Sequence, residues 1–139
     1  MFYHVKVQFT SVNEIGARIK EKHEVLVDNC EFFAEAEQKV LDEFIYAGTG
    51  DVEVTNMKRS NIMEFANSHQ GGDDENIYTA TIVSIFVEES GKEKETKYHV
   101  GVFAKSVNEA TSIVQQYMKM GLQDMRLVSV KETKIEQVL

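Results

Sequence analysis

The chain has 139 residues, of which 42% are hydrophobic, and this is enough to build a core for one compact domain or two very small ones. Its formal net charge of −8 is shared by both halves, so the composition predicts no bulk attraction for nucleic acid, although it leaves room for a local basic patch. The single cysteine excludes an internal disulfide framework, and the lack of a membrane-length apolar run or a signal-peptide pattern favours a cytoplasmic protein.

Two strands are predicted at the start of the chain. Phe2–Phe9 is an alternating run of β-branched and aromatic residues, which is typical of a strand with one buried face. A polar turn that contains Gly16 follows, and a second strand signal covers Arg18–Val27. The chain is therefore expected to open with two consecutive strands around a turn.

The hydrophobic period then changes from two to 3.6, which predicts a helix near Phe32–Tyr46. Asp28 or Asn29 is the expected N-cap, and Gly48 stands where glycine commonly ends a helix. A third strand, DVEVTNMKRSNI, is expected from Asp51 onward. Together these elements form a β-β-α-β unit.

The same order of signals returns roughly 74 residues later, which identifies an internal repeat. Ile77–Phe86 and Glu93–Phe103 repeat the two strands, with Gly91 in the turn between them. Ser106–Met120 repeats the helix, and the second copy of the last strand, DMRLVSVKETKI, begins at Asp124.

Each predicted helix carries one apolar stripe, which is expected to face the core. Ser106 and Glu109 form a capping-box pattern at the start of the second helix. The stripe residues that we expect to be largely buried are Phe33, Val40, Phe44, Ile113, Val114 and Tyr117.

The predicted fold class is α+β, with two tandem β-β-α-β repeats. We expect residues 1–65 to form the first repeat, residues 66–76 a flexible connector and residues 77–139 the second repeat, all within one pseudo-two-fold domain. Two such units would place about six mostly antiparallel strands in one sheet, with both helices on one face. The strand Ile77–Phe86 is apolar on both faces near its end, which favours either a homo-oligomer or a central strand covered by loops.

No catalytic motif is present, so the sequence predicts a protein that is not an enzyme and needs no cofactor. No motif around Cys30 indicates a catalytic nucleophile, and we interpret it as a small, partly buried residue. None of the four histidines has a metal-ligand spacing, and we predict no metal site. These histidines are His4, His23, His69 and His99, and the first two are expected on the more exposed face of predicted strands.

The preferred ligand-binding candidates lie around Lys58, Arg59 and Asn61, where two cations stand beside hydroxyl and amide groups in an acidic protein. Lys131 and Lys134 are their counterparts in the second copy. Tyr3 lies near the start of the first strand, where it would either stack on a base or pack in the core. This cluster is predicted to grip a small anionic ligand such as a nucleotide. The alternative is a solvated strand end.

Five segments of the chain resemble a domain-of-unknown-function family. These segments are FYHVKV, VDNCEFFAEAEQKVLDEF, DVEVTNMKRSNI, SGKEK and VKETKIEQV. Members of that family are small acidic proteins of gut anaerobes and, often, of their phages. The resemblance brings no activity, cofactor or catalytic residue. It implies a cytosolic protein, which in the phage case is made inside an infected host cell.

Three hypotheses about function follow. The preferred one is a non-catalytic, phage-encoded binding protein that sequesters a small nucleotide signal of host defence. The second is an interaction or inhibitor protein that binds a host protein through a sheet edge or an acidic surface. The third is a single-stranded nucleic-acid-binding module, against which the net charge counts. No membrane partner is expected.

Overall fold

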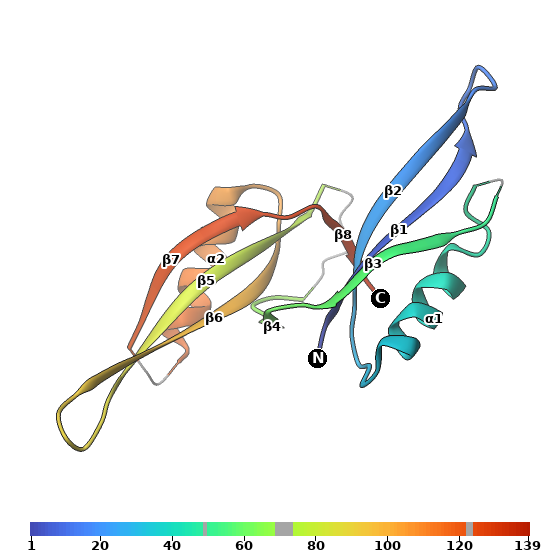
Figure 1. Cartoon of the computed structure of the whole chain (residues 1–139). Coiled ribbons are helices and arrows are strands. Elements are labelled where there is room, and N and C mark those ends of the chain that lie inside the picture. Colours follow the sequence, from blue (N-terminus) through green and yellow to red (C-terminus); the bar gives the residue numbers. More distant parts are fainter. Residues whose placement is uncertain (49, 69–73, 122–123) are drawn as a thin grey trace. The chain divides into compact units, whose positions relative to one another are not determined.

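The computed structural model describes residues 1–48, 50–68, 74–121 and 124–139. It confirms the predicted α+β class (Figure 1). In chain order the elements are β1 (Tyr3–Val12), β2 (Arg18–Val27), α1 (Phe33–Phe44), β3 (Glu53–Arg59), β4 (Ile62–Phe65), β5 (Asn76–Val87), β6 (Glu93–Ala104), α2 (Val107–Lys119), β7 (Asp124–Glu132) and β8 (Ile135–Val138). Of the expected connector 66–76, residues 69–73 lie outside the described residues. None of the described helices is long and apolar enough to cross a membrane.

The strands form two mixed four-stranded sheets, which corrects the expected single sheet of about six strands. The strand orders are β3-β1-β2-β8 and β4-β6-β5-β7. The expected strand after each helix breaks in two, into β3 and β4 in the first copy and β7 and β8 in the second. At that point Ser60 N–H donates to Phe2 O at 2.8 Å, and Thr133 N–H donates to Ile77 O at 3.0 Å. Each short strand that follows then pairs elsewhere.

The two short strands, β4 and β8, are exchanged between the repeats. The chain divides into two compact units, which we call unit 1 (residues 1–60 and 135–139) and unit 2 (residues 61–134). Strand β8 pairs in parallel with β2, with Ile135 opposite Glu24, and β4 pairs in parallel with β6, with Ile62 opposite His99. The compact units therefore differ from the sequence repeats 1–65 and 77–139 by one strand each.

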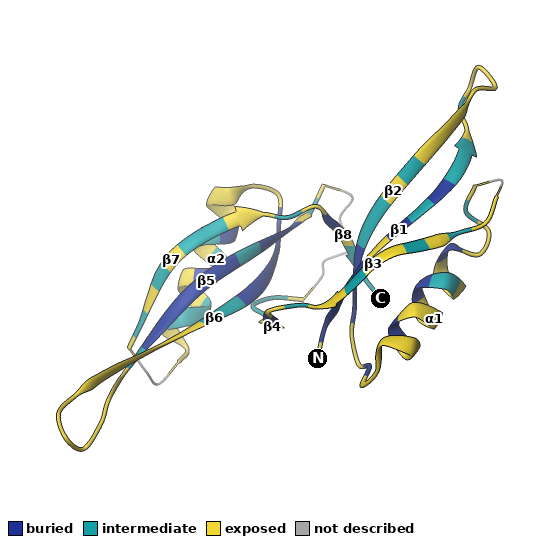
Figure 2. Cartoon of the chain, viewed as in Figure 1, coloured by how far each residue is buried: buried dark blue, intermediate teal, exposed yellow. Residues whose placement is uncertain are grey.

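Each unit has its own core between one helix and one sheet face (Figure 2). Val40 and Phe44 are buried in unit 1 and Val114 in unit 2, as the helix stripes predict. Phe33 is 42% exposed and packs edge-on against Tyr3, with ring centroids 4.9 Å apart, so its predicted burial is wrong. It lies in the first turn of α1, where the helix reaches the edge of the core. Ile113 and Tyr117 are only half-buried.

The helix ends agree only in part with those predicted from the sequence. Ser106 Oγ accepts a hydrogen bond from Glu109 N–H at 3.1 Å, which confirms the predicted N-cap of α2. Helix α1 begins after Phe32 without a side-chain cap, so neither Asp28 nor Asn29 fills that role. Gly48 has φ +71°, and a Cβ there would collide with the Thr10 carbonyl. A glycine is therefore required where the chain leaves α1.

Candidate anion-binding face of the first sheet

The sheet of unit 1 has one face packed against α1 and one face turned away from it. Tyr3, Val5, Val7 and Phe9 on β1 belong to the core beneath the helix. Since side chains alternate along a strand, the residues between them point to the opposite side. We call this opposite side the open face. Besides the cations described next, it carries His4, Gln8, Thr10, Glu24, Leu26, Glu53 and Asn56.

The open face gathers most of the positive charge of unit 1. Strand pairing places five of the unit's seven lysines and arginines there, and all five are exposed. They are Lys6, Arg18, Lys20, Lys22 and Lys58. On the other side of the sheet, α1 carries four acids and one lysine. The charges of unit 1 are thus segregated, which the net charge of −8 conceals.

The two carboxylates on the open face are engaged by neutral donors. His4 Nε2 lies 2.9 Å from Glu24 Oε1, and Gln8 Nε2 donates to Glu53 Oε2 at 2.9 Å. Within the described part of the chain, none of the five cations forms an ion pair. Their charges are therefore free to meet an external anion.

His4 lies among these cations but does not share their charge at neutral pH. Burial lowers the pKa of His4 below its ordinary value, and Lys58 and Lys6 lower it further. The hydrogen bond to Glu24 opposes this shift without cancelling it.

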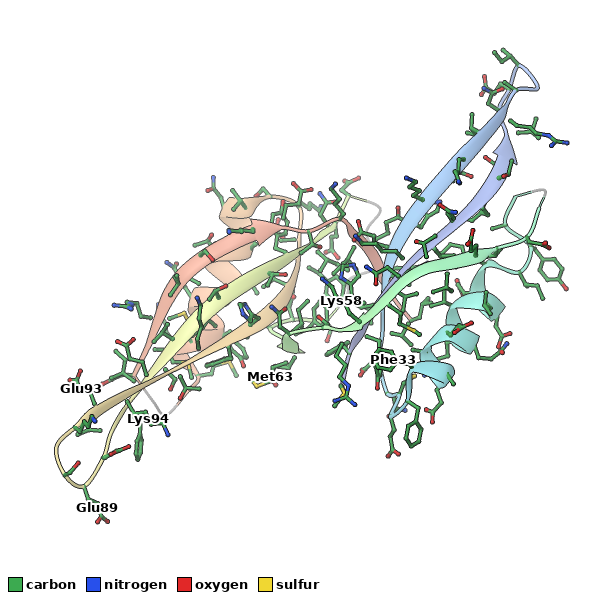
Figure 3. All side chains as sticks on the ribbon, viewed as in Figure 1. Phe33, Lys58, Met63, Glu89, Glu93 and Lys94 are labelled. Atoms are coloured by element: carbon green, nitrogen blue, oxygen red, sulfur yellow. The ribbon has the colours of Figure 1, made fainter. Side chains whose placement is uncertain are left out.

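The structure separates two of the predicted ligand residues. Lys58 lies opposite His4 on β1 and projects from β3 on the open face (Figure 3). Arg59 lies opposite Tyr3, on the helix side of the sheet. Adjacent residues of one strand point to opposite faces, so Lys58 and Arg59 cannot grip one phosphate from the same side. Tyr3 is fully buried, and its hydroxyl donates to Glu31 O at 2.8 Å. Of its two predicted roles, Tyr3 therefore packs in the core.

The remaining predicted residues belong to unit 2. Asn61 is exposed in the bend before β4, and Lys134 is exposed in the bend before β8. Lys131 lies on β7 opposite Thr79. The six predicted residues are therefore drawn from two units, and only Lys58 lies on the open face.

Sequence reasoning missed Lys6, Arg18, Lys20 and Lys22 as candidates. The signal was present, because Arg18, Lys20 and Lys22 stand at every second position of a predicted strand. Such spacing puts all three side chains on one face. Lys6 joins them only through the pairing of β1 with β2, which the sequence does not specify.

Unit 2 lacks a comparable basic face. In the repeat, Glu93 and Glu95 replace Arg18 and Lys20, and Thr81 replaces Lys6. Glu93 and Glu89 lie along the β5–β6 hairpin together with Lys94 (Figure 3). Lys97 and Lys131 keep the positive charges of Lys22 and Lys58, and Arg126 adds a third cation opposite Val83. Three acids on the same face, Glu93, Glu95 and Asp124, offset these charges. The basic face is thus a property of one copy.

Other candidates from the sequence have structural roles or are not described. His23 lies on the helix side of β2, stacked on Phe9 with ring centroids 5.2 Å apart, and its Nδ1 lies 2.6 Å from Glu136 Oε2. This corrects its expected place on the more exposed face. Cys30 is buried. His69 lies outside the described residues. Among the described residues no group of three or more acids, histidines or cysteines is arranged to hold a metal ion.

A hollow in unit 2 is a second candidate site. It has a volume of about 480 Å³ and is lined by Gln115, Met118, Lys119 and Met125. Tyr98 donates to Met125 Sδ at 3.1 Å. Burial and a hydrogen bond to Glu64 raise the pKa of Tyr117 well above its ordinary value. Burial also raises the pKa of Tyr98, so neither phenol is prepared to act as a base. The described lining of the hollow offers one cation, compared with five on the open face.

The fold and the open face define an α+β protein of two strand-exchanged units, one of which carries a basic sheet face. The family model described as domain of unknown function (DUF4494) matches residues 1–139, and the chain belongs to this family. This match confirms the expectation that the chain belongs to a family of unknown function. No curated protein and no solved structure matches the chain.

Proposed function

We propose that the protein is a non-catalytic binding protein and that the open face of unit 1 binds an anionic ligand of the nucleotide class. The observation that carries this proposal is the gathering of five exposed cations on one sheet face of an acidic protein, none of which forms an ion pair with a described residue. Such a concentration of like charge repels itself, so it weakens the fold slightly unless an anion is bound.

The chemistry of the face suits phosphate binding. Lysine ammonium groups are compact donors that hold phosphate through charge-assisted hydrogen bonds, and each such bond to a charged group contributes about 1.5–3 kcal/mol where it is partly shielded from water. The surrounding Gln8, Thr10 and Asn56 are polar and uncharged, so they add no repulsion toward an anion. The net charge of −8 repels anions at long range, so local contacts must supply the affinity.

A binding role agrees better with this face than catalysis does. Catalytic groups are commonly held in a water-excluding site with strongly shifted pKa values. The five cations are exposed, and the only histidine among them is kept neutral and hydrogen-bonded to Glu24. We further propose that the protein is phage-encoded, forms a homo-oligomer in the cytosol and sequesters a nucleotide signal of host defence.

Calorimetric titration against cyclic dinucleotides, ADP-ribose derivatives and short oligonucleotides tests the proposal. Removing two cations in the double variant Lys22→Ala/Lys58→Ala should weaken binding roughly 10- to 100-fold. The same variant should change the free energy of unfolding by less than about 0.5 kcal/mol, because both side chains are exposed.

The repeat supplies a matched control. Lys97→Ala/Lys131→Ala removes the two equivalent charges from unit 2 and should leave affinity within about twofold, because neither lysine belongs to the open face. Equal losses in both double variants would contradict the assignment to the open face. If the wild-type protein binds none of the panel, the proposed function itself is wrong.

A further inference from the structure

The five cations of the open face form a continuous row. Arg18, Lys20 and Lys22 follow one another on β2 at every second residue, a step of about 7 Å. Lys22 lies opposite Gln8, which makes Lys6 its diagonal neighbour on β1. Diagonal neighbours in a sheet lie about 7–8 Å apart. Each cation is therefore one similar step from the next.

The row continues across a third strand. Lys58 on β3 lies opposite His4, which makes it the diagonal neighbour of Lys6. Four steps of about 7 Å give a row close to 28 Å long, running from the β1–β2 hairpin to β3. A single mononucleotide can touch only part of such a row. A linear polyanion can touch all of it.

We infer that the ligand of the open face is single-stranded nucleic acid, held through consecutive phosphates and without recognition of base identity. This inference rests on the proposed function and narrows its ligand class. The backbone of one nucleotide in a stretched strand spans about one step of the row, so successive phosphates can meet successive cations. A rigid duplex curves its phosphates away from a flat row and engages fewer of them.

The residues between the cations explain why the bases are not read. Gln8, Thr10 and Asn56 are polar but carry no ring on which a base could stack. His4 provides the one ring that strand pairing places on the open face, whose residues are all described, and it is half-buried beside Glu24. Affinity must then come from phosphate contacts, which carry no sequence information.

The net charge alone predicts weak attraction for nucleic acid. Because the charges of unit 1 are segregated, the open face should attract it more strongly than the net charge indicates. The acids of α1 lie on the other side of the sheet from the row. Glu24 and Glu53 remain on the open face, so the binding should be moderate and strongly weakened by salt.

Fluorescence anisotropy with labelled oligothymidylates of increasing length, measured at several salt concentrations, tests this inference. The affinity should rise with oligonucleotide length until one strand contacts all five cations. For longer oligonucleotides, the affinity per binding site should stay constant. A plot of log K against log salt should have a slope of about −3 to −4, since each contacted phosphate of a single strand contributes about −0.7. Oligoadenylates of equal length should bind within a few-fold of the same affinity.

The double variant Lys22→Ala/Lys58→Ala should reduce the steepness of this slope by roughly 1 to 1.5, and Lys97→Ala/Lys131→Ala should leave it unchanged. If mononucleotides or cyclic dinucleotides bind as tightly as long oligomers, the proposed function holds and this inference is wrong. Equal or tighter binding of duplex, or a strong preference for one base, also overturns it. If no nucleotide of any length binds, the proposed function fails together with the inference.

Discussion

His4 lies at the centre of a basic face and yet contributes no charge to it at neutral pH. Its ring is half-buried, and burial is the main cause of its lowered pKa. Glu24 holds Nε2 by a hydrogen bond at 2.9 Å, so the neutral ring also fixes the position of a carboxylate that would otherwise attract the neighbouring lysines. The carboxylate of Glu24 is thus held by a neutral partner, as Glu53 is held by Gln8.

This residue should give the fold a measurable pH dependence. The folded-state pKa of His4 lies below its unfolded value of about 6.5, so the unfolded chain binds more protons as the pH falls through that value. The free energy of unfolding should therefore decrease between about pH 7 and pH 5. Urea denaturation across this range should show a shallower decrease for His4→Gln than for the wild-type protein.

A neutral neighbour provides the comparison for His4. Gln8→Asn changes the same strand without removing a titrating group, so it should keep the wild-type slope of unfolding free energy against pH. If His4→Gln and the wild-type protein lose stability in parallel as the pH falls, the assigned direction of the His4 pKa shift is wrong.

At the scale of elements, α1 covers one face of the unit 1 sheet and leaves most side chains of the other face partly or fully exposed. Val40 and Ala36 on α1 are completely buried against β1, β2 and β3, whereas Phe33 at the start of the helix is 42% exposed. The middle and end of α1 therefore form the main packing contact. This contact also fixes which face of the sheet remains open.

Val40→Ala tests that contact. The substitution removes two buried methyl groups and leaves a cavity, so it should lower the free energy of unfolding by about 2–3 kcal/mol. Ile113→Ala on α2 should cost less, because Ile113 is only half-buried. Chemical denaturation measures both, and the exposed Glu37→Ala serves as the control with a change below about 0.5 kcal/mol. A negligible effect of Val40→Ala would mean that α1 does not pack as described.

The exchange of the fourth strands is the main feature of the whole molecule. Strand β8, from the end of the second repeat, completes the sheet of unit 1, and β4 completes the sheet of unit 2. Ile135 and Ile62 occupy equivalent places at the start of these strands, and both are buried. Each unit therefore needs residues from both repeats, so neither repeat contains all four strands of a sheet.

A pair of equivalent substitutions distinguishes exchange from simple tandem repetition. Ile135→Ala should destabilise by about 2–5 kcal/mol and should reduce the hydrogen-exchange protection of amides in β2 more than in β6. Ile62→Ala should have the reverse pattern. Protection lost mainly in β6 for Ile135→Ala would show that β8 belongs to its own repeat and would exclude the exchange.

The order and type of the main elements follow from the sequence alone. The change of hydrophobic period marks the two helices, and the alternating runs mark the four long hairpin strands, because both patterns are set by residues close in the chain. The capping serine Ser106 and the turn glycines, Gly16 and Gly91, are local signals of the same kind. Their meaning depends on neighbouring residues and not on the rest of the fold.

Only the tertiary structure decided which strands pair and which side chains share a face. The partners of β4 and β8 lie in the other repeat, and a strand edge accepts either repeat's strand with similar hydrogen bonds. The sequence therefore predicted one sheet where two exist. In the same way, Lys58 and Arg59 are neighbours in the chain but lie on opposite faces, whereas Lys58 and Lys6 are distant in the chain but adjacent across strands. The physical reason is that periodicity is a short-range property of the backbone, whereas strand partner and register depend on contacts between residues far apart in the chain.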